Sequence, residues 1–190
     1  MVVTTPTLAA DAASLPPEGA QFEARGGPSL PTLAQAWDAL GSVPDPEVPA
    51  ISIVELGIVR DVSVVDGRFR VVVTPTYSGC PATGMIADMI RERLADIGVS
   101  DAELVTTLSP PWTTDWMAPE GKRKLAEYGI APPRHVVNVA GISRMRKAVV
   151  PCPRCGSSAT SLLSQFGSTA CKAQYRCDDC REPFDYFKPH

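Results

Sequence analysis

The stretches PCPRCG (residues 151–156) and CDDC (residues 177–180) decide the fold of the C-terminal part of the chain. In each stretch two residues separate a pair of cysteines, so both sulfurs can reach one ion while the backbone amides of the turn point towards them. A further 21 residues lie between the pairs, enough for a hairpin that joins the two turns. The sequence therefore predicts a closed tetrahedral metal site with four thiolate ligands: Cys152, Cys155, Cys177 and Cys180. Zinc or a single iron fits four thiolates, and the lack of an evident redox partner favours zinc.

The segment around these pairs is too short to fold on its apolar side chains alone. The composition changes at Pro151, and five of the six cysteines fall in the last 39 residues. A unit of about 40 residues usually needs a metal or disulfides to stay ordered. We therefore predict a zinc-ribbon-like β module over residues 148–190, in which metal binding and folding are one event. Its strands would carry Leu162, Leu163, Phe166, Tyr175, Phe184, Tyr186 and Phe187.

The chain as a whole is mildly acidic, with 18 basic and 21 acidic side chains and a net charge of −3. Proteins that hold nucleic acid by its phosphates normally carry a basic excess, which the few basic residues at 144–147 do not supply. No secretion signal is visible, and no apolar run approaches the ~20 residues of a membrane span. We therefore expect a cytoplasmic protein without membrane contact, a compartment where paired cysteines bind metal rather than form disulfides.

The N-terminal three quarters of the chain predict a disordered segment followed by an α+β domain. Residues 1–30 are rich in Ala, Pro, Gly and Ser without a hydrophobic period, which is typical of disorder. Residues 31–147 alternate helical and strand patterns, and Asp66-Gly67 is a tight hairpin signal. The fold class is therefore a small helix-covered sheet followed by the ribbon module. The expected elements are helices at 33–40, 81–97 and 119–128 and strands at 58–65, 69–74 and 103–108.

Cys80 stands apart from the other cysteines. Pro81 suits the first position of a helix, so Cys80 is predicted to be the N-cap. The helix dipole and the unpaired amides there would favour the thiolate, which binds metal or attacks an electrophile. An isolated cysteine is as often a small core residue, and the residues alone leave both interpretations open. A catalytic Cys–His pair is not supported, because no motif brings His135 near Cys80.

Several further motifs carry a resemblance to a known family. DPEVP (45–49), LGIV (56–59), PTYSGCP (75–81) and PPWTTDW (110–116) resemble the small domain of iron–sulfur assembly factors such as SufT. Together with the PCPRCG stretch, FGSTACK (166–172) and EPFDYF (182–187), the whole is similar to the PaaD family, which belongs to the phenylacetyl-CoA epoxidase system. The match covers residues 31–188, and the combination of motifs is specific where each alone is weak.

The resemblance implies an accessory role in aerobic phenylacetate catabolism, in supplying or repairing the iron–sulfur cluster of the epoxidase's reductase component. It implies that Cys80 is the functional cysteine, holding iron or a transient cluster, with Asp45 and Glu47 in the acidic loop nearby. The implied partners are the reductase and the other epoxidase components, and a homodimer is left open. Cys171 lies outside the two pairs and is either a small buried residue or an auxiliary ligand. The resemblance implies a further cysteine where Pro189 stands here, so Cys171 lacks that possible partner.

Two other functions compete with this interpretation. The chain would be an integral part of the oxygenase complex, although not its catalytic component, because carboxylate–histidine pairs for a di-iron site are absent from the sequence. Alternatively, the ribbon would bind nucleic acid, which the acidic balance disfavours.

Overall fold

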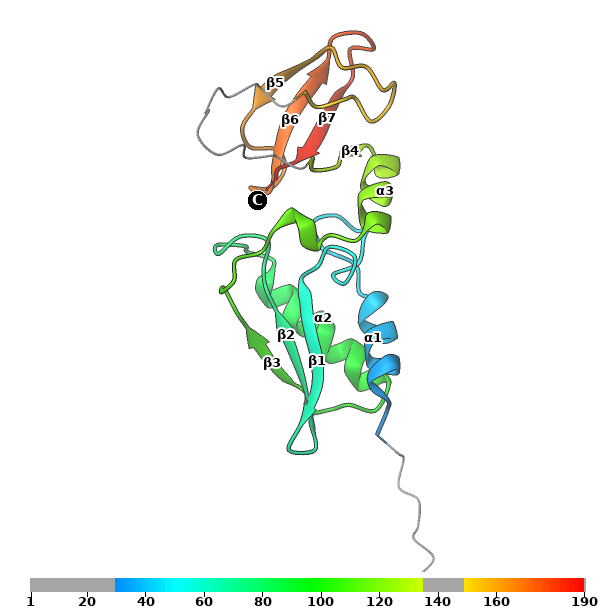
Figure 1. Cartoon of the computed structure of the whole chain (residues 1–190), viewed down its shortest axis with the longest axis vertical. Coiled ribbons are helices and arrows are strands. Elements are labelled where there is room, and N and C mark those ends of the chain that lie inside the picture. The colour runs from blue at the N-terminus through cyan, green and yellow to red at the C-terminus, as the bar shows by residue number, and fades with distance from the viewer. Residues whose placement is uncertain (1–29, 135–148, 190) are drawn as a thin grey trace, which may run out of the picture.

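The computed structural model describes residues 30–134 and 149–189 and arranges them in two stacked parts (Figure 1). The larger part contains the helices α1 to α3 and a three-stranded sheet, and the smaller part is a four-stranded sheet. The α+β class predicted from the sequence is confirmed. The helices are α1 (Leu33–Gly41), α2 (Thr83–Asp96) and α3 (Pro119–Tyr128), with a 3-10 turn, η1, at Thr114–Trp116. The strands are β1 (Val59–Val65), β2 (Arg68–Val73), β3 (Glu103–Thr106), β4 (Ile130–Ala131), β5 (Thr160–Ser164), β6 (Lys172–Cys177) and β7 (Pro183–Phe187).

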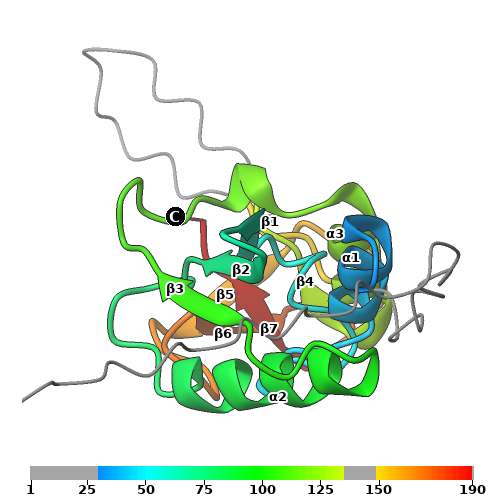
Figure 2. The same ribbon diagram turned by 90° about the horizontal axis from the view of Figure 1, so that it is seen from below.

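The sheet of the larger part has the order β1-β2-β3, with β1 antiparallel and β3 parallel to β2. The hairpin turns at Asp66 and Gly67, both with positive φ, as the sequence predicts. Along β2 every second residue is buried, which gives the sheet one apolar face. Helix α2 covers that face with Ile86, Ile90 and Leu94 (Figure 2).

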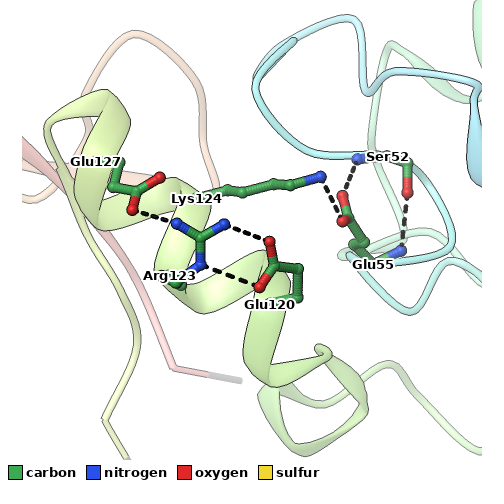
Figure 3. A network of polar contacts seen from close by, with 6 residues as sticks. All are labelled: Ser52, Glu55, Glu120, Arg123, Lys124 and Glu127. Carbon is green, nitrogen blue, oxygen red and sulfur yellow. Dashed lines mark hydrogen bonds and ion pairs between the residues drawn. The ribbon is translucent and has the colours of Figure 1, made fainter.

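Helix α3 is held against the loop that precedes β1. Gly121 lets the helix backbone approach that loop, because a Cβ at this position would lie 2.9 Å from the carbonyl oxygen of Glu55. Lys124 donates to the Glu55 carboxylate at 2.6 Å, and the same carboxylate accepts the backbone amide of Ser52 (Figure 3). Arg123 pairs with Glu120 and Glu127 on the outer side of the helix. The exposed pairs add little stability, so α3 is fixed by its buried Leu125, by the amide of Ala118 donating to the Glu55 carbonyl at 2.8 Å, and by the close approach at Gly121.

The smaller part is a sheet of order β4-β7-β6-β5 that contains the predicted ribbon strands. The prediction that a strand carries Phe166 is wrong, because β5 ends at Ser164 and Phe166 lies exposed in the loop that follows. Strands β5, β6 and β7 are antiparallel neighbours, and β4 lies parallel to β7. Strand β4 precedes residue 148 in the chain, so one strand of this sheet comes from outside the module as bounded from the sequence. Helix α3 leads directly into it, which ties the two parts together.

The hydrophobic core of the larger part extends into the junction with the ribbon. Cys171 and Phe187 belong to the ribbon in sequence, yet they pack with the large core. The rings of Trp112 and Phe187 lie 6.0 Å apart between centroids, tilted by 55°. The remaining ribbon residues form a separate small cluster around Val150 and Cys177.

Three sequence predictions lie outside the described residues. They are the disorder predicted for residues 1–30, of which only the last is described, a further strand that the sequence pattern at 135–141 allows, and the solvent exposure of the basic residues at 144–147. Among the helices of the described residues, none combines the length and apolarity needed to cross a bilayer.

Candidate metal centre and cargo site

Four thiols converge at the end of the ribbon. The sulfurs of Cys152, Cys155, Cys177 and Cys180 all lie within 4.8 Å of one another, and in the described residues this is the one such group of potential metal ligands. The Sγ–Sγ distances are 3.7 Å for Cys152–Cys180 and 3.5 Å for Cys155–Cys177. Thiolates at ~2.3 Å from a tetrahedral ion are separated by roughly 3.8 Å, whereas a disulfide needs about 2.05 Å. The four thiols therefore fit a closed metal site, and all six cysteines of the chain are free.

The backbone around these thiols favours the thiolate at one of them. The amide of Cys180 donates to the sulfur of Cys177 at 3.5 Å, and this hydrogen bond lowers the pKa of the Cys177 thiol to about 7. Cys180 shows the opposite shift: a backbone hydrogen bond from Glu182 lowers its pKa, but burial and the neighbouring thiols raise it to about 12. Four like charges so close together are unfavourable without a cation, so metal binding must displace the remaining protons.

The cysteine loop of the larger part places Cys80 just ahead of α2. The helix begins at Thr83 with Ala82 as its N-cap, so the prediction that Cys80 caps the helix is wrong. Pro81 lies before the N-cap rather than at the first helical position, which moves the helix start by two residues. The carbonyl of Cys80 accepts the Thr83 hydroxyl at 2.8 Å, and the thiol is partly buried against the core.

Of the two interpretations that the sequence left open for Cys80, the surroundings of the thiol in the free protein favour the small, partly buried residue over an activated thiolate. Burial raises the pKa of the Cys80 thiol, and the negative charges of Glu47 and Asp45 raise it further. A backbone hydrogen bond from Ala82 acts in the opposite direction but does not reverse the shift. The burial and the two carboxylates leave no pattern in the residues next to Cys80, whereas the helix start is visible in the sequence. In the free protein these surroundings favour the protonated thiol at Cys80.

Asp45 is buried and shapes the loop that carries Glu47. Its Oδ1 accepts the backbone amides of Glu47 at 3.0 Å and Val48 at 2.8 Å. Burial raises the pKa of this carboxyl, while the two backbone hydrogen bonds lower it, as does the charge of Lys172. Because Oδ1 is committed to the loop backbone, Asp45 acts as a positioning residue for Glu47.

Glu47 contacts Cys171, a ribbon residue whose position next to Glu47 could not be predicted from the sequence. The Cys171 thiol lies 3.6 Å from Glu47 Oε2 and 3.0 Å from the Thr169 hydroxyl. Cys171 is not in the group of four ribbon thiols. Burial raises its pKa to about 11, and the charge of Glu47 adds to the shift. No local signal in the sequence indicates this contact, because 124 positions separate the two residues.

A hollow of about 360 Å³ lies beside the cysteine loop. It is lined by residues 74–78 together with Leu108 and residues 111–113. The buried hydroxyl of Thr74 borders it and has no hydrogen-bond partner in the part of the chain that the structure describes. One side of the cysteine loop thus faces open space rather than packed core.

Comparison with known proteins identifies both parts. A model of the iron–sulfur cluster assembly protein family matches residues 33–105, and a model of the PaaD zinc beta ribbon domain matches residues 139–188. The fold and the four-thiol site thus define the class: an iron–sulfur assembly domain joined to a metal-binding β ribbon.

Relatives narrow the class to one family. The chain is 49% identical over 160 residues, 83% of its own length and 93% of the relative's, to an Escherichia coli (strain K12) protein named as a subunit of 1,2-phenylacetyl-CoA epoxidase. The chain therefore belongs to the PaaD family of epoxidase proteins. The larger part alone is similar to two proteins named Fe-S protein maturation auxiliary factors. They are YitW of Bacillus subtilis (42% identity, 42% of this chain and 79% of the relative) and SufT of Staphylococcus aureus (43% identity, 39% and 85%).

Proposed function

We propose that this protein is an accessory factor of the phenylacetyl-CoA epoxidase system that carries iron or an iron–sulfur cluster to the reductase component. The observation that carries the proposal is the coexistence of two different thiol sites in one molecule. Four ribbon thiols form a closed set suited to a resident ion, whereas Cys80 is a single, partly buried thiol at the end of a loop whose residues 74–78 line a hollow. A complete set of four protein ligands suits a structural ion, whereas an incomplete set leaves a position through which a bound ion can be exchanged.

The ribbon site holds zinc in this proposal. The four thiolates would hold zinc, whose two positive charges would offset half of their negative charge and link the two cysteine turns. The residues around it hold β5, β6 and β7 in register, and Cys180 contributes both its sulfur and the backbone amide that donates to Cys177. The six free thiols fit the reducing cytoplasm, which we propose as the compartment.

The raised pKa of Cys80 suits a carrier. Cargo binding must displace the thiol proton, and departure of the cargo is assisted when the proton returns. A thiol whose pKa is raised by burial recovers its proton readily at neutral pH. Return of the proton would favour transfer of the cargo to a client with a complete ligand set.

The test is the cluster content of the reductase in cells that carry Cys80→Ala in place of the native residue. We expect the variant to accumulate folded with normal ribbon metal, and the purified reductase to contain several-fold less iron and acid-labile sulfide. Ser78→Ala, an exposed residue of the same loop, is the matched control and should leave the reductase fully loaded. A fully loaded reductase in the Cys80→Ala strain would overturn the proposal.

A second candidate follows from the name of the Escherichia coli relative, which describes that protein as part of an enzyme. In this case the present protein would be a stoichiometric component of the working epoxidase complex. Its co-purification with active enzyme at a constant ratio would support this function. Full activity of a purified complex without the protein would exclude it.

A further inference from the structure

Strands β6 and β7 connect the four-thiol site to the junction with the larger part. Strand β6 starts at Lys172 and ends at Cys177, which is one of the four thiols, and β7 runs back to Phe187 (Figure 1). Arg176 pairs with Pro183 at the thiol end, and Lys172 pairs with Phe187 at the junction end. The register of the two strands therefore links the cysteine turns to the residues that contact the larger part.

The junction end of these strands covers buried residues of the larger part. Phe187 is 1% exposed, and its ring lies 6.0 Å from that of Trp112 between centroids. Cys171, which directly precedes β6, is 3% exposed, and its thiol donates to Glu47 Oε2 at 3.6 Å. The amide of Lys188 donates to the Cys171 carbonyl at 3.0 Å, which joins the two contacts into one unit. This end of the ribbon is thus part of the large core.

Trp112 connects the junction to the cysteine loop. It is 4% exposed and lines the hollow together with residues 74–78. The carbonyl of Tyr77, another lining residue, accepts the amide of Cys80 at 3.2 Å, so the wall of the hollow and the cysteine belong to one turn. Phe187 therefore packs against a residue that forms one wall of the hollow, and its departure would leave Trp112 partly uncovered.

The ribbon has little besides the four thiols to keep its junction end in place. Two of the buried residues in its own small cluster, Cys152 and Cys177, belong to the thiol site itself. So small a cluster does not hold strands in register without an ion. Because an ion binds the folded ribbon and not the unfolded one, occupancy of the thiol site shifts the ribbon towards the ordered, docked form.

We propose that occupancy of the four-thiol site controls the hollow beside the cysteine loop. In the occupied form the ribbon holds Phe187 on Trp112 and Cys171 on Glu47. In the empty form both contacts are released, and the wall that Trp112 forms opens. This inference rests on the proposed function and deepens it, because the resident ion then regulates the loop at which cargo is exchanged.

The test is the fluorescence of Trp112 in full-length protein, recorded under reducing conditions with zinc bound and after removal of zinc by a strong chelator. Trp37→Phe and Trp116→Phe together leave Trp112 as the only tryptophan of the chain. We expect blue-shifted emission with weak acrylamide quenching in the zinc-bound protein, and red-shifted emission with several-fold stronger quenching without zinc. Amide hydrogen exchange at residues 74–80 should rise in parallel, while β1 and β2 stay protected.

Two further variants of this protein separate release of the junction from unfolding of the ribbon. Phe187→Ala should keep one zinc per chain and the exchange protection of β5, yet show the stronger quenching of Trp112 in the presence of zinc. Leu163→Ala, which changes an exposed residue of β5, is the matched control and should respond to zinc like the parent protein.

Unchanged emission and quenching of Trp112 after complete removal of zinc would overturn the inference. Loss of protection in β1 and β2 would also overturn it, because the ion would then stabilise the whole molecule rather than the junction. Either result leaves the carrier function standing, since the cluster content of the reductase tests that function. A fully loaded reductase in the Cys80→Ala strain, together with the expected response of Trp112, would overturn the carrier function alone.

Discussion

Glu47 is the residue that most strongly shapes the chemistry of the junction. Its carboxylate lies against the Cys171 sulfur, its charge acts on Cys80, and its place is set by the hydrogen bonds that Asp45 makes to the loop backbone. A negative charge beside two thiols keeps both of them protonated when no cation is present. A carboxylate at this place therefore favours the protonated form of both thiols.

Replacing Glu47 should therefore change the reactivity of Cys80 in a defined direction. In Glu47→Gln the negative charge is gone, so the pKa of the Cys80 thiol falls and more thiolate is present at any pH below it. We expect faster alkylation of Cys80 by iodoacetamide at neutral pH, followed by peptide mass spectrometry in zinc-loaded protein. Glu103→Gln removes a carboxylate that does not act on Cys80 and is the control. Equal rates in the wild type and Glu47→Gln would show that Glu47 does not control the thiol.

Asp45 should behave as a structural residue of the same loop. Asp45→Ala leaves the buried amide of Val48 and that of Glu47 without their acceptor, at a cost of about 1–3 kcal/mol in the free energy of unfolding. Asp45→Asn retains an acceptor oxygen and should cost less. Urea unfolding of the two variants measures the difference. Equal stability of the wild type and Asp45→Ala would contradict the assigned role.

At the scale of elements, local signals in the sequence predicted most of the larger part. The hairpin at Asp66-Gly67, the end of α3 at Gly129 and the start of that helix at Pro119 are set by residues within a few positions of each boundary. The start of α2 was misplaced because Ala82 is the N-cap, which no side-chain signal marks. Strand β4 was not predicted, because two residues are too few to show the alternation of apolar and polar side chains that marks a strand. Their extended conformation depends on pairing with β7.

The docking of α3 should depend on the missing side chain of Gly121. Gly121→Ala places a Cβ 2.9 Å from the Glu55 carbonyl oxygen, so helix and loop must move apart, at a cost of about 1–3 kcal/mol. Gly84→Ala is the matched control on α2. Its Cβ meets nothing within 4 Å, so the change should be neutral or stabilise by about 0.5–1 kcal/mol. Thermal unfolding compares the two, and an unchanged midpoint for Gly121→Ala would contradict the close approach.

At the scale of the whole molecule, the spacing of the four ribbon cysteines was enough to predict the closed metal site. The junction was not predictable in the same way. Cys171 reaches Glu47, and Phe187 reaches Trp112, only after both parts have folded and docked. Such contacts depend on long-range packing, which leaves no pattern in the neighbouring sequence.

Metal removal should unfold the ribbon and leave the larger sheet folded. Without an ion the small cluster around Val150 and Cys177 has too few apolar side chains to hold β5, β6 and β7. After treatment with a strong chelator under reducing conditions, we expect fast amide hydrogen exchange in these strands and continued protection in β1, β2 and α2. Protection of β5 to β7 that survives complete metal removal would contradict the fit of the four thiols to a structural ion.

The central claim is that the two thiol sites have different functions. The most direct test is to measure metal and acid-labile sulfide in anaerobically purified protein and to compare the wild type with Cys80→Ala. We expect one zinc per chain in both proteins, and additional iron, with or without sulfide, in the wild type alone. One metal per chain, identical in the two proteins and free of sulfide, would contradict a cargo site at Cys80.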